Sequence, residues 1–266
     1  MTKRWTVFLF GALSYLITLG VFAELIVFAG DLPVSRTVDG PPPGAGGPSL
    51  ALDLVLDLGL IALFGLQHSL MARPAVKRAL ARLVPAAALR SLYVLLAGAA
   101  LAVLMRLWRP LPGALWHASR GWPHALLTAL FAGGWLTVLG CTFLVGHFDL
   151  LGLRQVTLEL RGRPYTPLPF VDGGIFGLVR HPLMLAFLAA FWIVPVMGWG
   201  HLLLAAGMTG YILVGIAFEE RDLERAFGER YRRYRARVPM LVPGLRVGRR
   251  GAAAGVSTAA GRGGER

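Results

Sequence analysis

The sequence contains a single cysteine, few charged residues and none of the short motifs typical of soluble nucleotide, zinc or serine enzymes. Cys141, alone among 266 residues, excludes an internal disulfide and a metal site built from several thiolates. Charged residues make up 15% of the chain and hydrophobic residues 56%, whereas soluble domains average about 25% charged residues. This composition predicts a polytopic membrane protein in which Cys141 is a small core residue.

The missing motifs narrow the chemistry further. The chain has no Gly-rich phosphate loop after a strand, no His-Glu-x-x-His helix and no Gly-x-Ser-x-Gly turn. His68, His147 and His181 could meet in three dimensions, but no acidic or thiolate set of ligands accompanies them in the sequence. We therefore expect no bound metal.

Acidic residues are also scarce, with 14 Asp and Glu against 27 Lys and Arg, for a net charge of +13. The basic residues interrupt apolar segments instead of forming a soluble basic face, so we expect no nucleic-acid partner. No segment indicates an obligate protein partner. The partner that composition predicts is membrane lipid.

Six apolar segments predict an all-α fold, a polytopic transmembrane bundle of about six membrane helices. They are Trp5–Ala29, Leu50–Met71, Leu89–Leu107, His124–Gly146, Leu183–Met197 and His201–Phe218. The first is too long for a signal peptide and lacks a cleavage site, so we interpret it as a retained helix. The last two form a C-terminal hairpin, with helices of about 15 and 19 residues, that leads into a cytoplasmic amphipathic helix.

The basic residues give the orientation. An even number of crossings places both termini on one side, and all but four of the 27 Lys and Arg fall on that side. The exceptions are Arg36, Arg106, Arg109 and Arg120. By the positive-inside rule both termini are cytoplasmic.

No internal repeat divides the chain, so residues 1–243 are expected to form one membrane domain. The Pro- and Gly-rich stretch from Asp31 to Ser49 predicts an irregular external loop. Residues 244–266 are rich in Gly, Ala and Arg without apolar periodicity. They predict a disordered, basic cytoplasmic tail near anionic lipid.

Polar residues gather at the predicted cytoplasmic ends of the helices. His68, His147 and His181 lie at three such ends. Around them are Gln67, Arg90, Asp149, Arg154, Arg180, Glu219 and Glu220. Ionisable groups near membrane depth normally face a cavity or a partner, so these positions predict a pocket open to the cytoplasm. Contact with lipid headgroups is the alternative, chiefly for the arginines.

Helical spacing assigns Glu220 to a buried face. One stripe along a single final helix comprises Ile216, Glu220, Leu223, Phe227, Tyr231, Tyr234 and Val238. Arg225, Arg232 and Arg235 fall on other faces and are expected to be solvated. On the second helix, Asp57 is a costly intramembrane group, for which we favour a structural hydrogen bond to another helix over catalysis.

The C-terminal motifs carry a family resemblance. The chain contains Arg180-His181-Pro182, Glu219-Glu220, a Gly228-x-x-Tyr231-x-x-Tyr234 helix and Val238-Pro239. This pattern resembles the C-terminal signature of the isoprenylcysteine carboxyl methyltransferase superfamily, which are integral-membrane enzymes that use S-adenosylmethionine. Met184 stands where the superfamily has a tyrosine, so a cofactor contact through that ring is not expected.

Longer strings narrow the resemblance. They are Phe64-Gly65-Leu66-Gln67-His68-Ser69-Leu70-Met71-Ala72-Arg73-Pro74, Arg90-Ser91-Leu92-Tyr93-Val94-Leu95-Leu96, Trp108-Arg109-Pro110, His147-Phe148-Asp149-Leu150-Leu151-Gly152-Leu153-Arg154-Gln155-Val156 and Arg161-Gly162-Arg163-Pro164-Tyr165-Thr166-Pro167-Leu168-Pro169-Phe170. They are similar to the bacterial methanethiol S-methyltransferase family, over most of the chain from about Leu50 to Pro243. The resemblance implies transfer of the S-adenosylmethionine methyl group to methanethiol, giving dimethyl sulfide, in the bacterial inner membrane.

The resemblance and the chemistry together give the candidate residues. A thiol has to present a thiolate, so a base or a nearby cation is expected. The expected catalytic residues are His147, held by Asp149, with His68 as the second candidate base and Arg154 as the cation. The expected cofactor-binding residues are Gln155, Arg180, His181, Glu219, Glu220 and Tyr231.

Three alternatives stay open from the sequence. The chain could methylate another thiol or a carboxylate, or it could be a non-catalytic membrane accessory protein with the same fold. A membrane reductase is the third, since sterol reductases share a related C-terminal pattern.

Overall fold

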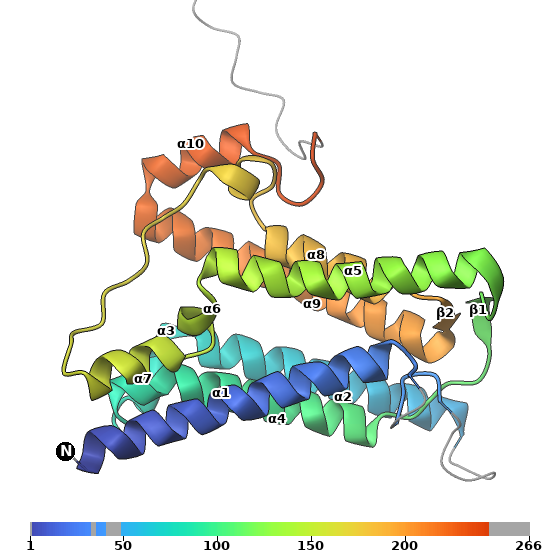
Figure 1. Ribbon diagram of the computed structural model, residues 1–266, viewed down its shortest axis with the longest axis horizontal. Helices are drawn as coiled ribbons and strands as arrows, with labels where there is room; N and C mark the ends of the chain where they lie inside the picture. The colour runs from blue at the N-terminus through green and yellow to red at the C-terminus, as the bar shows by residue number, and fades with distance from the viewer. Residues whose placement is uncertain (1, 33–35, 41–48, 245–266) are drawn as a thin grey trace, which may run out of the picture.

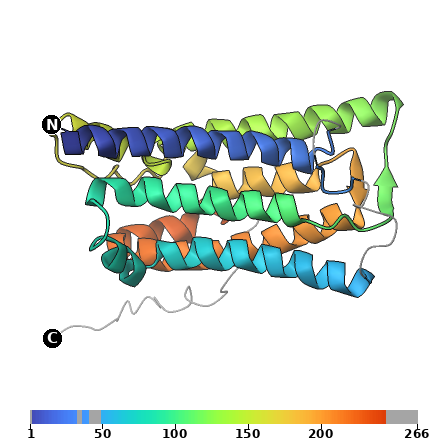
Figure 2. The same cartoon turned by 90° about the horizontal axis from the view of Figure 1, so that it is seen from below.

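The computed structural model describes residues 2–32, 36–40 and 49–244. Residues 33–35 and 41–48 of the expected outer loop, and the expected basic tail from 245 onward, lie outside these residues. The described chain is a bundle of helices running along one long axis, with a small two-stranded sheet at one end (Figures 1 and 2). The predicted all-α polytopic fold is confirmed.

Five helices in the described part of the chain are long and apolar enough to cross a membrane. They are α1 (Thr2–Ala29), α2 (Leu50–Ala72), α4 (Leu89–Leu107, preceded by the 3₁₀ turn η1, Ala86–Ala88), α5 (Gly121–Val145) and α9 (Trp199–Phe227). The shorter elements are α3 (Pro74–Leu80), α6 (His147–Leu150), α7 (Leu153–Leu160), η2 (Gly174–Gly177), α8 (Pro182–Trp192), α10 (Glu229–Arg237), β1 (Ala114–His117) and β2 (Val196–Gly198).

The sixth predicted membrane helix is only partly helical. α8 has 11 residues, about 16 Å, where a hydrocarbon core is about 30 Å thick. The helix ends before Pro195, and the chain continues extended into β2, which pairs antiparallel with β1. Val194 and Met197 are almost fully buried, as expected where non-helical backbone at membrane depth is covered by protein.

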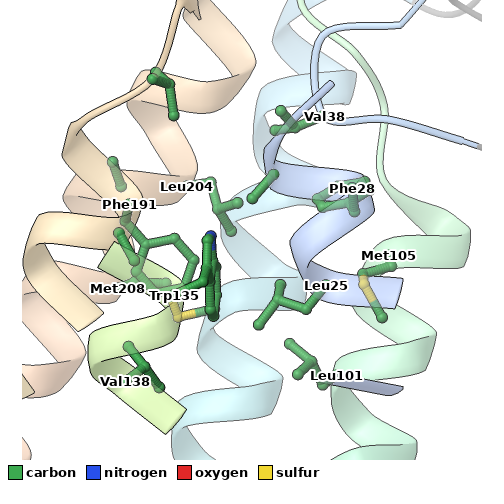
Figure 3. Packing of buried hydrophobic residues seen from close by; sticks show 14 of the residues in the cluster. Leu25, Phe28, Val38, Leu101, Met105, Trp135, Val138, Phe191, Leu204 and Met208 are labelled. Carbon is green, nitrogen blue, oxygen red and sulfur yellow. The ribbon is translucent and has the colours of Figure 1, made fainter. Parts of the chain in front are cut away.

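The apolar core lies between the N-terminal helices and the hairpin (Figure 3). Trp135 of α5, Phe191 of α8 and Met208 of α9 pack on one side of Leu204, and α1 and α4 supply the other side. Cys141 is 3% exposed within this cluster, so its predicted core role is confirmed. Many leucines on the outer faces of the bundle are exposed, which is the arrangement that lipid requires.

Two features position the short helices at the end of the bundle opposite β1 and β2. Gly11 brings α1 against α7, because a Cβ at this position would lie 2.5 Å from the Val156 side chain. Gly228, with φ of 55° and ψ of −127°, separates α9 from α10. The predicted single final helix is therefore wrong. The predicted burial of Tyr231 and Tyr234 on one face, with Arg232 exposed, is confirmed.

The intramembrane Asp57 is fully buried and has a structural role. Its Oδ1 accepts a hydrogen bond of 2.9 Å from the backbone N–H of Arg109. A structural hydrogen bond is confirmed, but the prediction of another helix as its partner is wrong, because Arg109 lies in the loop just beyond the end of α4. Asp57 thereby connects α2 to the segment that follows α4.

Candidate functional site

The turn before α8 pairs with the segment that follows α10. The backbone N–H of Arg180 donates to the carbonyl of Pro239 at 2.9 Å, and that of His181 donates to Met240 at 3.2 Å. Two motifs that lie nearly 60 residues apart, Arg-His-Pro and Val-Pro, are thus joined through main-chain hydrogen bonds. This pairing brings α10 over the mouth of the hairpin.

A buried ion cluster forms beside this pairing. The carboxylate oxygen Oε1 of Glu220 lies 2.8 Å from Nε and 2.6 Å from Nη2 of Arg180, and 3.2 Å from Nε2 of His181. The Arg180 guanidinium also donates to the carbonyl of Val238. The predicted proximity of Arg180, His181 and the two glutamates is confirmed.

The His181 ring lies between the carboxylates of Glu219 and Glu220. Its Nδ1 lies 3.5 Å from Glu219, whose side chain is 48% exposed, and its Nε2 faces Glu220, whose side chain is 13% exposed. Burial opposes protonation of His181, but the hydrogen bonds and charges of the two glutamates outweigh it. The pKa of His181 is therefore raised above its usual value.

Two tyrosines of α10 close the cluster. The Tyr234 hydroxyl donates to the carbonyl of Phe176 at 2.7 Å. Tyr231 is 1% exposed, and its hydroxyl has no hydrogen-bond partner among the described residues. Burial and the nearby Glu220 raise the pKa of Tyr231. A buried neutral hydroxyl without a partner is costly, and it marks a place where a ligand atom would be stabilising.

Met184, at the position of the expected tyrosine, has an apolar role. It packs against the buried residues Ile212, Ile216 and Leu241. This contact joins α8 to α9.

His147 is held by hydroxyl groups and not by Asp149. Its Nδ1 lies 2.8 Å from the Thr142 hydroxyl, and its Nε2 lies 2.9 Å from the Tyr15 hydroxyl. Thr142 donates its own proton to the carbonyl of Leu139, so it accepts from Nδ1–H, and the lone pair on Nε2 accepts from Tyr15. The expected His147–Asp149 pair is corrected: both ring nitrogens already have other partners. Burial lowers the pKa of His147.

Asp149 pairs with a different group from the one expected. Its carboxylate lies 2.8 Å from Arg154 Nη1 and accepts from the Tyr165 hydroxyl at 3.2 Å. Arg154 also donates to the carbonyl of Thr166. These contacts attach the Pro-rich segment 164–169 to α6 and α7. The side-chain nitrogen of Gln155 donates to the Asp149 carbonyl at 3.1 Å, while its buried oxygen has no partner within the described chain.

His68 lies among aromatic rings. Ring centroids of Tyr93 and Tyr211 are 4.8 Å and 5.8 Å from that of His68, and Phe64 is 5.6 Å away. Arg90 connects this group to α6, because its guanidinium lies 5.0 Å from the Tyr93 ring and its Nε donates to the carbonyl of Leu150 at 2.7 Å.

The three histidines therefore lie at one end of the bundle, as the helix ends predicted, but in different surroundings. α6, α7 and α10 lie at the end opposite β1 and β2 (Figure 1). In the part of the chain that the structure describes, no group of three or more His, Cys, Asp or Glu could hold a metal ion. The groups suited to a charged or hydroxylated ligand are Glu219, the Tyr231 hydroxyl and the Gln155 amide.

Sequence reasoning missed several residues that contact the histidines, among them Tyr15, Thr142, Tyr93 and Tyr211. Tyr93 follows Arg90 by three residues, a spacing that places both on one helix face. For Tyr15, the available signal was its position beside the buried small and polar residues Gly11, Ser14 and Thr18 of α1. Nothing in the sequence distinguishes Thr142 or Tyr211 from other core residues.

Comparisons with known proteins agree with the family resemblance carried by the sequence motifs. Residues 55–257 match the NnrU protein family. The chain is 47% identical over 241 residues to a methanethiol S-methyltransferase of Mycobacterium tuberculosis, covering 91% of this chain and 97% of that protein. It is 42% identical to methanethiol S-methyltransferase 2 of Bradyrhizobium diazoefficiens, covering 94% and 95% of the two chains. It is 31% identical to nurim of Sus scrofa, over 79% of this chain and 86% of that protein. No solved structure matches the chain.

Proposed function

Since the chain belongs to the NnrU family and to the family of the methanethiol S-methyltransferases, we propose that it methylates methanethiol to dimethyl sulfide. The observation that carries the proposal is the 47% identity that covers nearly all of both chains. The methyl donor in this proposal is S-adenosylmethionine. It supplies a methyl group already activated on a sulfonium sulfur.

The donor site we propose lies around the ion cluster of α8, α9 and α10. Every guanidinium nitrogen of Arg180 contacts Glu220 or a backbone carbonyl, so Arg180 positions the carboxylate instead of meeting the donor itself. Glu220 and the half-exposed Glu219 offer negative charge to ammonium or hydroxyl groups, with His181 held between them. The unpartnered Tyr231 hydroxyl and Gln155 oxygen fit a ligand rich in polar groups.

The chain's contribution to the transfer is positioning and removal of a proton. Aligning the thiol sulfur with the methyl carbon accounts for much of such a rate. Even the reference cysteine thiol, with a pKa near roughly 8.5, is mostly protonated at neutral pH, so we propose that a histidine, His147 or His68, accepts the proton of the methanethiol substrate. Arg154 and Asp149 hold the Pro-rich segment 164–169 in place, and the Arg154 charge favours a thiolate.

We propose that the protein lies in the inner membrane of a bacterial cell. Its site faces the cytoplasm, and both termini lie on that side. The distribution of Lys and Arg supports this orientation. A charged, water-soluble donor would reach the site from the cytoplasm, and a small apolar thiol would reach it through lipid. In this proposal residues 1–243 act as one membrane domain, and the basic tail 244–266 lies near the lipid surface.

Purified protein tests the proposal directly. Calorimetric titration with S-adenosylmethionine and with nicotinamide dinucleotides, followed by gas chromatography of the headspace after methanethiol is added, measures binding and product together. Binding of S-adenosylmethionine with dimethyl sulfide formation is the expected result. Binding without product on methanethiol would direct the search to other thiols or carboxylates. Binding of neither ligand would favour a membrane accessory role, and nicotinamide binding would favour a reductase.

A further inference from the structure

The surroundings of His68 differ from those of every other histidine at this end of the bundle. Rings from three helices meet around it: Phe64 of α2, Tyr93 of α4 and Tyr211 of α9. Phe64 and Tyr211 also contact each other, with ring centroids 5.4 Å apart. We call Phe64, His68, Tyr93 and Tyr211 the aromatic cluster. A close approach of helices supports it, since a Cβ at Gly65 would lie 3.2 Å from the Tyr211 ring.

Neither ring nitrogen of His68 makes a hydrogen bond within the part of the chain that the structure describes. Nδ1 is buried as well as unpartnered. By contrast, both nitrogens of His147 are engaged by Thr142 and Tyr15. An unpaired buried acceptor is costly. The fold retains this cost at one nitrogen that lies among aromatic rings.

We infer that the aromatic cluster is the binding site of the thiol acceptor and that Nδ1 of His68 takes the thiol proton. The inference rests on the proposed methyl transfer and names the residues that would select and activate its acceptor. Aromatic rings suit a small apolar sulfur compound, because contacts between sulfur and an aromatic ring are favourable. The S–H group would supply the hydrogen bond that Nδ1 lacks.

The proton and electron balance of this step is simple. With the imidazole proton on Nε2, the lone pair of Nδ1 accepts the proton of the thiol. The thiolate sulfur forms a bond to the methyl carbon of the sulfonium donor. The donor's sulfur–methyl bond breaks, and its electron pair stays on the donor sulfur. The proton on His68 then returns to solvent, and the site holds a neutral thioether.

The position of the cluster fits both reactants. α2 is the least buried of the five long helices, with exposed leucines at Leu63, Leu66 and Leu70 around His68, so a small apolar thiol would reach the cluster from lipid. Arg90 lies over the Tyr93 ring, and its positive charge favours a thiolate beside His68. Tyr211 lies two helical turns before Glu219 on α9, which connects the cluster to the proposed donor site.

Acceptor selectivity tests the cluster as a binding site. Phe64→Ala would enlarge the site, so the ratio of kcat/KM for propanethiol to that for methanethiol should rise about 10-fold or more. Phe64→Leu should move the ratio in the same direction by less, and it serves if the alanine variant does not fold. Phe143→Ala is the matched control, since it removes the ring stacked 4.3 Å from His147 and should leave the ratio at the parent value. An unchanged ratio in folded Phe64 variants would overturn the assignment, as would a larger change in the Phe143 variant.

Substitution of His68 tests the proton step. His68→Ala, with His68→Gln as the variant of similar volume, should bind S-adenosylmethionine as the parent does. Dimethyl sulfide formation at neutral pH should fall about 10²- to 10⁴-fold, and the deficit should shrink as the pH approaches the pKa of the thiol. His147→Ala should give a deficit that does not change with pH. Parent-like activity of a folded His68 variant, or a deficit independent of pH, would overturn the inference while leaving the methyl transfer intact. A parent protein that makes no dimethyl sulfide would overturn the proposed function instead.

Discussion

Glu220→Gln removes one negative charge from the centre of the ion cluster while keeping the shape and an acceptor oxygen of the side chain. In the parent, Glu220 Oε1 receives contacts of 2.6 Å and 2.8 Å from Arg180 and 3.2 Å from His181. The Arg180 and Glu220 side chains are 10% and 13% exposed, so solvent screens this charge little. The substitution should therefore weaken donor binding more than the same substitution at an exposed carboxylate would.

The magnitude follows from the loss of charge in one hydrogen bond. Hydrogen bonds to charged groups contribute about 1.5–3 kcal/mol and neutral ones about 0.5–1.5 kcal/mol. Replacing the first kind by the second where Glu220 meets the donor costs about 1–2 kcal/mol. At about 1.4 kcal/mol for each factor of ten, S-adenosylmethionine should bind about 5- to 30-fold more weakly.

Glu224→Gln is the matched control, because it makes the same change one turn further along α9. The Glu224 side chain, 35% exposed, pairs with Arg232 and Arg235, whose side chains are about half exposed, and such pairs contribute about 0–1 kcal/mol. Its affinity for S-adenosylmethionine should equal that of the parent.

Isothermal titration calorimetry of the detergent-purified variants, with a thermal melt of each, separates binding from folding. Glu220→Asp keeps the charge and should bind more tightly than Glu220→Gln. A folded Glu220→Gln variant with the parent's affinity would remove Glu220 from the donor site. Equal losses in the Glu220 and Glu224 variants would show that overall charge, and not this cluster, governs binding.

Three further predictions concern the pH dependence of stability, the membrane topology and the packing of α1 on α7. Because the pKa of His181 is raised in the folded protein, the stability it contributes should be full below about pH 6.5 and lost as the pH rises through the raised value; thermal melts across a pH series should show this decline, and His181→Asn, which does not titrate, should lack it. Reporter fusions after Val242 should be cytoplasmic and fusions within residues 41–48 periplasmic, and a periplasmic C-terminus would separate the proposed donor site from the cytoplasm. Gly11→Val should destabilise the packing of α1 on α7 by about 1–3 kcal/mol, since the added atoms meet Val156; Gly20→Ala, where the structure leaves open space around the new Cβ, should leave the melting temperature near that of the parent.

The sequence alone determined the membrane class, the number of apolar segments and the family. These follow from properties that need no tertiary contact: the low charge, the length of each apolar segment and strings of residues such as Arg180-His181-Pro182. It also placed Glu220, Tyr231 and Tyr234 on one face, because the three-to-four-residue spacing continued across Gly228 even though the helix does not. The proximity of Arg180 and His181 to the glutamates followed from the length of the hairpin.

The sequence did not determine which partners the buried polar groups meet. Asp149 is two residues from His147, yet its carboxylate turns to Arg154 and Tyr165, while His147 contacts Tyr15 from a helix 132 residues away. Hydrogen-bond direction depends on side-chain rotamers and on which helix packs alongside, and neither is encoded in local spacing. The same holds for the 11-residue α8, whose extended continuation exists because β1 supplies hydrogen bonds that only the packed bundle brings within reach. The aromatic cluster around His68 joins three helices, so tertiary structure alone leaves one imidazole nitrogen buried and free of protein partners within the described chain.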